Sequence, residues 1–235
     1  MFKKPIKIKS NNQAKGSERK SIKDLFCKNF PSIPEAEANS LFNNKKEPLT
    51  CIKILTHDNE TIIVYCIQKV PMFFCLQEKV LPTIYLLWKM PDLIPNFTTR
   101  TDVMRFISSG ADLMLPGVVT PGVQSGLSKY GQVQQGCPVY INFSTNRAAV
   151  AVGVASQSSF DMERAGGKGK CVNIYHFFGD HLCTIDGNNK PLPQLGPPEW
   201  LILKSYNTDF PKLVSSEQEI TPQDSNTLNS VPEST

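Results

Sequence analysis

Residues 109–119, SGADLMLPGVV, constrain the fold more than any other stretch, because three kinds of local structure meet there. Apolar residues at helical spacing precede the stretch, Thr101 and Asp102 are suited to cap the start of that helix, and Gly110 can take the left-handed conformation that closes it. Residues 113–115 are too short for a second helix and predict a strand. Pro116-Gly117 then suits the centre of a type II turn. The stretch therefore predicts a helix end, a strand and a tight turn in succession.

The first third of the chain carries a mixed α and β pattern. Residues 49–55, 61–67 and 72–76 are rich in β-branched and aromatic side chains, which favour strands. The polar residues 57–60 separate the first two runs as a hairpin loop does. Apolar side chains recur at helical spacing over residues 17–30, and Pro31 follows, so we expect a helix that ends there.

Two further segments border this unit. Residues 1–8 alternate loosely between apolar side chains and lysine, which predicts a short edge strand with a charged outer face. Residues 81–88 are again rich in β-branched and aromatic side chains, and we expect another strand there. Together these segments indicate an α+β domain whose boundary falls near residues 79–82.

The second half alternates between strand-like runs and turns. We expect strands at residues 135–143, 148–155 and 172–178, a turn at residues 144–147 and a helical turn at residues 161–165. The middle strand carries valines on one face and alanine or glycine on the other. The valines predict core positions. A row of small side chains permits close approach, most often by a packed helix and alternatively by a ligand.

Three blocks of sequence occur in the order GADLMLPGVV, NRAAVAVGVASQSS and GKCVNIYHFFGDHL. They resemble a PUA domain, the small RNA-binding β-barrel named after pseudouridine synthases and archaeosine transglycosylases. With the N-terminal block, the chain resembles the N-terminal half of the ligatin family, initiation factors of the 2D type, whose shorter relative is the malignant T-cell-amplified sequence protein. Relatives carry an aromatic residue after His-Leu, where this chain has Cys183.

The resemblance implies an α+β fold with two domains and a tail. It predicts a pre-PUA domain at residues 1–81, a PUA-type small β-barrel at residues 82–184, and a linker and tail at residues 185–235 that is largely disordered. In this family a strand that begins near Pro82 already belongs to the barrel. Within the tail, the apolar residues 200–203 are candidates to dock as an added strand or to contact a partner.

Seven cysteines are scattered through the chain, and we expect reduced thiols that act as small apolar side chains. Zinc at Cys171, His176, His181 and Cys183 is the alternative. These residues lack the spacing typical of structural zinc, and residues five apart in a strand point to opposite faces, so we predict no metal. No apolar run reaches the ~20 residues that span a bilayer. We therefore expect a soluble, cytoplasmic protein without cofactor or membrane partner.

The sequence contains no recognisable catalytic site. No serine lies in a G-x-S-x-G turn, and His176, Asp180 and His181 more often have a structural role. The GGKGK run at residues 166–170 invites comparison with a phosphate loop, but Cys171 stands where that motif needs serine or threonine. We expect a flexible connection there, with contact to an RNA phosphate as an addition. An enzyme is therefore not predicted.

Charge is distributed unevenly along the chain. Within residues 1–30, nine lysine or arginine residues face two acids, whereas from residue 199 onward two lysines face six acids. A basic start and an acidic end favour an RNA-facing end and a solvated end. The ligatin resemblance further implies binding to the small ribosomal subunit, ribosomal RNA and transfer RNA, in non-canonical initiation, reinitiation or post-termination recycling.

The candidate RNA contacts fall into two groups. Those in the first domain are the basic residues Lys3, Lys4, Lys7, Lys9, Lys15, Arg19 and Lys20. Those around the mouth of the barrel are Gly110, Ala111, Asp112, Leu113, Gly117, Arg147, Lys168 and Lys170. A protein-interaction module and an accessory subunit of an RNA-modification complex are the alternative functions. Because the longer relatives continue into further domains, those missing domains or a separate partner chain are also expected partners.

Overall fold

The computed structural model describes residues 1–42, 47–77, 79–121, 128–185, 187 and 190–201. Its first unit contains β1 (Lys7–Gln13), α1 (Gly16–Asn29), α2 (Glu35–Phe42), β2 (Leu49–Leu55), β3 (Thr61–Ile67), β4 (Val70–Leu76) and β5 (Lys79–Pro82). The five strands form one antiparallel sheet in sequence order. The strands predicted at residues 49–55 and 61–67 are confirmed to the residue, and the predicted helix is confirmed as α1.

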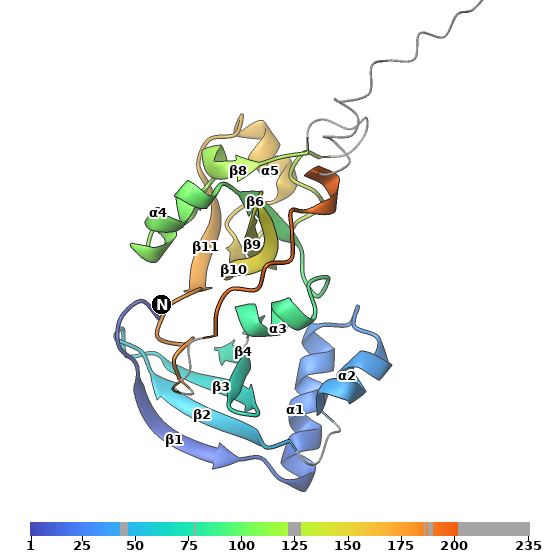
Figure 1. The fold of residues 1–235 in the computed structure, drawn as a ribbon, viewed down its shortest axis with the longest axis vertical. Helices are drawn as coiled ribbons and strands as arrows, with labels where there is room; N and C mark the ends of the chain where they lie inside the picture. Colours follow the sequence, from blue (N-terminus) through green and yellow to red (C-terminus); the bar gives the residue numbers. More distant parts are fainter. Residues whose placement is uncertain (43–46, 78, 122–127, 186, 188–189, 202–235) are drawn as a thin grey trace, which may run out of the picture.

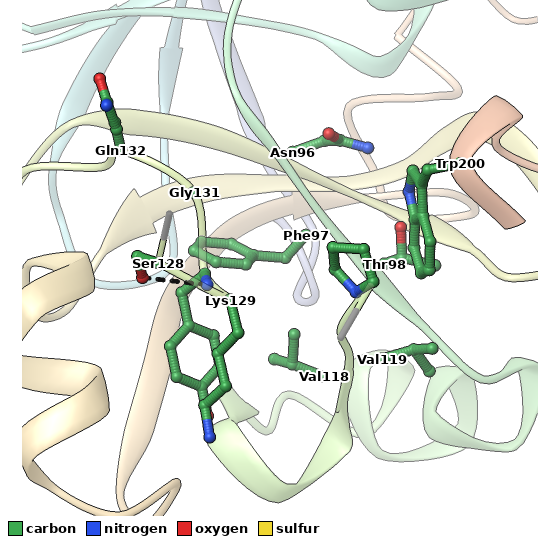
Figure 2. A pocket seen from close by; sticks show the side chains of 12 residues that line it. Asn96, Phe97, Thr98, Val118, Val119, Ser128, Lys129, Gly131, Gln132 and Trp200 are labelled. Carbon is green, nitrogen blue, oxygen red and sulfur yellow. Dashed lines mark hydrogen bonds between the residues drawn. The ribbon is translucent and has the colours of Figure 1, made fainter. Parts of the chain in front are cut away.

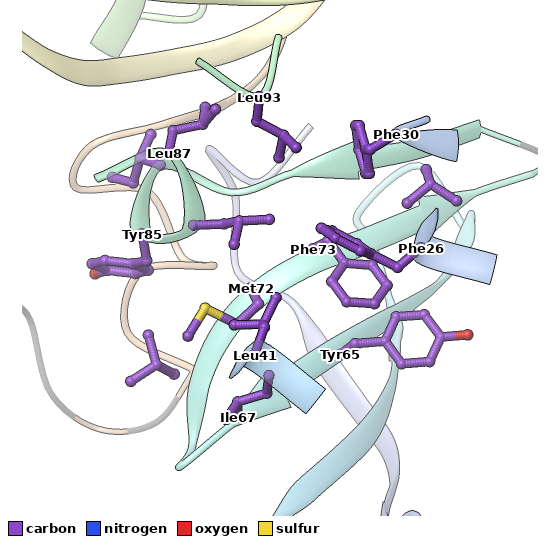
Figure 3. Close-up of a cluster of buried hydrophobic side chains, with 14 of the residues drawn as sticks. Phe26, Phe30, Leu41, Tyr65, Ile67, Met72, Phe73, Tyr85, Leu87 and Leu93 are labelled. Atoms are coloured by element: carbon purple, nitrogen blue, oxygen red, sulfur yellow. The ribbon is translucent and has the colours of Figure 1, made fainter. Parts of the chain in front are cut away.

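Aromatic side chains hold α1 and α2 against one face of this sheet (Figure 3). The ring of Phe26 on α1 lies 4.9 Å from that of Phe30, 5.3 Å from that of Phe42 and 5.2 Å from that of Phe73, measured between centroids. These distances fall in the range of favourable aromatic pairs. The apolar stripe predicted for residues 17–30 therefore faces the sheet.

The second unit contains α3 (Ile84–Lys89), β6 (Asn96–Thr99), the 3₁₀ turn η1 (Thr101–Val103), α4 (Met104–Ser108), β7 (Leu113–Met114), the 3₁₀ turn η2 (Leu115–Gly117), β8 (Val118–Val119), β9 (Pro138–Phe143), β10 (Asn146–Ala155), α5 (Ser159–Arg164) and β11 (Lys170–Phe177). Its sheet has the order β7-β11-β10-β9-β6-β8, and β6 and β9 are parallel. The two end strands are joined by η2, so the sheet curls into the expected barrel (Figure 1).

The strand predicted at residues 81–88 is wrong. β5 ends at Pro82, and the following residues form α3, whose start is capped by the Thr83 hydroxyl, which accepts a hydrogen bond from the Leu86 N–H at 3.4 Å. Residues 84–87 are buried on every side, because α3 lies between the two sheets (Figure 1). A helix that is buried on every side carries apolar residues on every side. In a short run of sequence, such a pattern looks the same as that of a buried strand.

The edge strand predicted at residues 1–8 is displaced, since β1 begins only at Lys7. Of the residues ahead of it, Phe2 enters the core instead. Phe2 is fully buried, with its ring 5.2 Å from that of Phe74 and 6.2 Å from the imidazole of His176. The Phe2 carbonyl accepts a hydrogen bond from the N–H of His181 at 3.0 Å. The start of the chain therefore closes the junction between the two units.

The stretch around residue 110 differs from its prediction at two points. Gly110 does close α4, with a φ of +93°, and the N–H of Ala111 donates to the Phe106 carbonyl at 2.9 Å. Asp102, however, pairs with Arg100 at 3.2 Å instead of capping the helix. Gly117 lies in a 3₁₀ turn without positive φ, so the type II turn is wrong.

The second-half strands are confirmed with shifted ends. The turn predicted at residues 144–147 is shorter, because β10 already begins at Asn146. The row of small residues on β10 meets two neighbours. The Trp88 indole of α3 donates to the Ala149 carbonyl at 2.9 Å, which agrees with the predicted helix contact. At Gly153 the neighbour is the adjoining strand, since an added Cβ would lie 2.1 Å from the Asn173 carbonyl oxygen.

Within the predicted tail, residues 193–199 are bonded to the start of β10. The Asn146 side chain donates to the Pro193 carbonyl at 2.8 Å and accepts from the Leu195 N–H at 3.1 Å. Residues 199–201 then form a helical turn instead of the proposed added strand. Residues 202–235 lie outside the described part of the chain. Among the described helices, all are too short or too polar to cross a lipid bilayer.

Replacing Phe2 should test whether the start of the chain holds the two units together. Phe2→Ala is expected to lower the free energy of unfolding by about 3–5 kcal/mol, because a fully buried ring is lost and a cavity remains. Phe2→Leu should cost clearly less. Urea denaturation measures both values. A loss below about 1 kcal/mol for Phe2→Ala would show that the junction does not depend on this ring.

The buried cysteines predict a loss of stability at alkaline pH. Burial raises the pKa of Cys171 and of Cys183 from 9.0 to about 12, and all seven cysteines are free thiols. Between these pKa values the unfolded chain releases thiol protons that the folded chain keeps, so the free energy of unfolding falls as pH rises above about 9. Urea unfolding at about pH 8 and about pH 10.5 measures this decrease. Cys171→Ala should make it smaller; an unchanged decrease contradicts the assignment.

Candidate nucleic-acid interface

A pocket of about 180 Å³ lies where the two units meet. The first unit lines it with Met1, Lys3, Lys4, His57 and Asp58, and the barrel lines it with Ile107, Gly110, Ala111, Ile174 and Phe177. Two predicted groups of RNA contacts, the first lysines and the Gly110-Ala111 pair, therefore share one site, which we call the junction pocket.

Lys3 reaches directly across the junction. Its ammonium group donates a hydrogen bond to the carbonyl of Ser109, the residue before Gly110. An added Cβ at Gly110 would lie 3.0 Å from Cδ and 3.2 Å from Nζ of Lys3. Glycine at position 110 takes the positive φ without strain, and a Cβ added there would require the Lys3 side chain to shift.

Lys4 and His57 form the other wall of the junction pocket. The Nζ atom of Lys4 lies 3.4 Å from both imidazole nitrogens of His57, and His57 Nδ1 lies 3.6 Å from Asp58 Oδ1. These side chains are exposed. His57 was not among the predicted contacts, because nothing in the sequence of a hairpin loop indicates which distant residue it will meet.

Asp112 and Leu113 have structural contacts. The Asp112 carboxylate accepts from the Ile174 N–H at 2.9 Å and pairs with Lys170 Nζ at 2.7 Å. Leu113 is buried in the barrel core. These contacts fasten β7 to β11, so the two residues shape the mouth of the barrel, and the Lys170 charge is partly compensated by its partner.

The other barrel candidates lie apart from the junction pocket's lining. The Gly117 carbonyl accepts from the Thr99 hydroxyl at 2.6 Å, which fixes the turn after β7. Arg147 on β10 pairs with Glu199 at 3.2 Å. Lys168 is exposed in the glycine-rich turn that follows α5. Of these residues, Lys168 is the one whose side chain is presented to solvent in a connecting turn.

The remaining basic candidates of the first unit separate into two kinds. Lys7 and Lys9 lie on the exposed edge strand β1, and Lys15 and Lys20 are exposed at the start of α1. The Arg19 side chain instead donates hydrogen bonds to backbone carbonyls of the same unit. Its Nε donates to the Phe42 carbonyl at 2.7 Å, and its Nη1 donates to the Glu47 carbonyl at 2.9 Å. Arg19 therefore ties α1 to the end of α2 and the start of the next strand.

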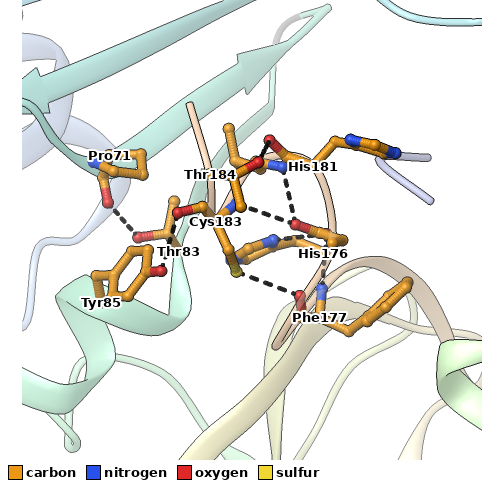
Figure 4. A network of polar contacts seen from close by, with 10 residues as sticks. Pro71, Thr83, Tyr85, His176, Phe177, His181, Cys183 and Thr184 are labelled. Atoms are coloured by element: carbon orange, nitrogen blue, oxygen red, sulfur yellow. Dashed lines mark hydrogen bonds and ion pairs between the residues drawn. The ribbon is translucent and has the colours of Figure 1, made fainter. Parts of the chain in front are cut away.

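A buried polar cluster stands behind the junction (Figure 4). The Asp180 carboxylate accepts from His176 Nδ1 at 2.8 Å and from the N–H groups of Phe177 at 2.9 Å, Leu182 at 3.0 Å and Cys183 at 3.3 Å. Of the four residues in the zinc alternative, His176 and Cys183 converge with Asp180, with ligand atoms within 4.8 Å of one another, whereas Cys171 and His181 do not belong to this group.

The bonding of this cluster is that of a structural anchor. The Asp180 oxygens already have N–H donors, and burial raises the pKa of the Cys183 thiol to about 12, so it is not a thiolate at neutral pH. The Cys183 carbonyl accepts from the Tyr85 hydroxyl of α3 at 3.1 Å. The cluster thus joins the end of the barrel to the shared helix.

Comparison with known proteins identifies the same two kinds of domain in the same order. The family models for a Pre-PUA-like domain and for the PUA domain of eIF2D match residues 2–91 and 94–181. The crystal structure of a PUA domain from Aeropyrum pernix is 22% identical, with a TM-score of 0.55 over 77% of this chain and 92% of that one. The structure of a PUA-domain protein from Thermoplasma acidophilum is also 22% identical, with a TM-score of 0.51 over 74% of this chain and 97% of that one. The fold is therefore that of a two-part PUA protein.

Sequence relatives define the family more narrowly. The human eukaryotic translation initiation factor 2D is 38% identical over 84% of this chain and 32% of its own length. Translation machinery-associated protein 20 of Saccharomyces cerevisiae is 25% identical over 77% of this chain and 97% of its own length. The chain belongs to the family of eukaryotic translation initiation factor 2D, and its described part spans the Pre-PUA and PUA domains. The names of these relatives are those of proteins of translation.

Replacing Gly110 should reveal the contact with Lys3. Gly110→Ala and Gly179→Ala both place a Cβ at a φ near +90°, but only Gly110 has neighbouring atoms within 4 Å. Both should lose about 1–2 kcal/mol of stability from the backbone, and Gly110→Ala should lose more. In a Lys3→Ala background the extra loss should vanish, as a double-mutant cycle by urea denaturation measures. An extra loss that persists would contradict the contact.

Proposed function

We propose that the chain binds the small ribosomal subunit and transfer RNA, and that it acts in non-canonical initiation, reinitiation or post-termination recycling. The observation that carries the proposal is the junction pocket, where lysines of the first unit converge on the Gly110-Ala111 loop of the barrel. Family membership supports the same reading, because the relatives are named for translation. The chain spans about a third of the length of the longer relatives, so the proposal concerns this portion.

The physical basis is electrostatic. Lysine ammonium groups attract phosphates and release counterions from RNA, which sets affinity without reading sequence. Lys3 and Lys4 are held in place at the junction, and Lys7 and Lys9 extend the charge along β1. RNA approaching the barrel mouth would meet both groups. Shape recognition of a structured RNA then follows from the fixed spacing between these cations and the barrel.

We propose different roles for the remaining predicted RNA contacts. Lys15, Lys20 and Lys168 are exposed and suit peripheral phosphate contacts. Arg19 and Lys170 have protein partners, and for them we propose a supporting role in shaping the surface. We retain the cytoplasm as the proposed location. We also retain the proposal that no reaction is catalysed, since the Asp180 carboxylate and the Tyr85 hydroxyl are engaged in structural hydrogen bonds.

Reversing the charge at the junction should weaken RNA binding. Lys3→Glu with Lys4→Glu is expected to lower affinity for small ribosomal subunits and transfer RNA by about 100-fold near physiological salt, and to reduce the salt dependence. Lys69→Glu with Lys89→Glu makes the same charge change at exposed positions outside the junction pocket and should have a small effect. Co-sedimentation on sucrose gradients and filter binding measure the two affinities.

The same experiment separates the alternatives. Unchanged co-sedimentation of the Lys3 and Lys4 variant would contradict the proposal. Binding of a protein partner that persists at high salt and after nuclease treatment would favour the interaction module. Association with a modification enzyme or its guide RNA, in place of ribosomes, would favour the accessory subunit.

A further inference from the structure

The barrel has a second and larger pocket, away from the junction pocket (Figure 2). Its volume of about 380 Å³ lies within the ~300–1,000 Å³ typical of small-ligand sites. Figure 2 shows the Trp200 indole on one side and Lys129 on the other, with Phe97 and Val118 between them. Apolar walls with a few polar groups are the usual composition of a ligand site.

Trp200 is held over this pocket by the segment that precedes it. The buried Asn146 side chain uses both of its polar atoms: Nδ2 donates to the Pro193 carbonyl at 2.8 Å, and Oδ1 accepts from the Leu195 N–H at 3.1 Å. The Arg147 N–H donates to the Gly196 carbonyl at 2.7 Å. These bonds fix residues 193–196 on the barrel, and the ion pair of Arg147 with Glu199 at 3.2 Å attaches the residue next to Trp200.

We propose that this pocket binds a single unpaired nucleotide of an RNA ligand, with its base stacked on the Trp200 indole and its phosphate near Lys129. The inference rests on the proposed RNA-binding function and adds to it a separate site for an unstacked base. Aromatic side chains bind unstacked bases of RNA by stacking, and this is the usual means by which proteins recognise single-stranded RNA.

The lining favours a nucleotide over other ligands of similar size. Asn96 and Gln132 contribute side-chain amides, which offer both a donor and an acceptor to the edge of a base. Among the described lining residues none is acidic, and Lys129 supplies the positive charge that a phosphate needs. The volume suits one base with its sugar and is small for a folded element.

The test compares binding of a short single-stranded RNA and of a blunt RNA duplex by the full chain. Trp200→Ala should weaken binding of the single strand about ten-fold, as expected for loss of one stacking contact, and should leave duplex binding unchanged. Trp200→Phe should retain most of the affinity. Phe160→Ala removes an exposed aromatic ring of α5 that does not line the pocket, so it serves as the matched control.

Tryptophan fluorescence gives a second readout. The chain has two tryptophans, and Trp88 is bonded to the Ala149 carbonyl in the interior, so quenching that disappears in Trp200→Phe reports on the pocket. Single-strand affinity equal to the wild type in Trp200→Ala, or quenching that survives Trp200→Phe, overturns the inference. One further outcome separates this inference from the proposed function. If the Lys3 and Lys4 variant loses RNA binding while Trp200→Ala binds single-stranded RNA as the wild type does, the proposed function stands and the nucleotide site is excluded. Absence of any RNA binding by the wild type overturns both.

Discussion

The arrangement of the two units depends on the hydrogen bonds that the buried Asp180 carboxylate accepts. A buried carboxylate is costly unless donors surround it, and here His176 and three backbone N–H groups supply them. That bonding fixes the turn after β11, which in turn presents the Cys183 carbonyl to Tyr85 and the His181 N–H to Phe2. One charged group therefore sets the geometry of contacts that lie on both units.

The same junction brings together residues of both units that we propose as RNA contacts. The first unit supplies charges on long side chains, and the barrel supplies a glycine loop that lets one of them cross, as the contact of Lys3 with Gly110 illustrates. Because α3 packs against both sheets, the distance between the lysines and the barrel is set before any ligand arrives. Such preorganisation lowers the entropic cost of binding.

The sequence could predict elements whose pattern is local. Residues 49–55 and 61–67 are rich in β-branched side chains, so their strands could be predicted to the residue. The helix α3 could not, because a helix buried on all sides has no polar face. Among the site residues, the basic character of the N-terminus was visible. The different roles of Arg19 and Lys3 could not be predicted. Arg19 binds backbone carbonyls and Lys3 crosses to the barrel, and both contacts depend on the tertiary structure, which the spacing of residues along the chain does not encode.

The covered face of the first sheet has a consequence for synthesis of the protein. Ile54, Val64 and Phe74 are buried beneath Phe2 and Leu182, which comes more than a hundred residues later in the chain. While the polypeptide is being made, the part of the cover that Leu182 supplies is missing until the end of the barrel has emerged from the ribosome. The nascent first unit therefore exposes part of its apolar face, and its final closure waits for contacts of very long sequence separation.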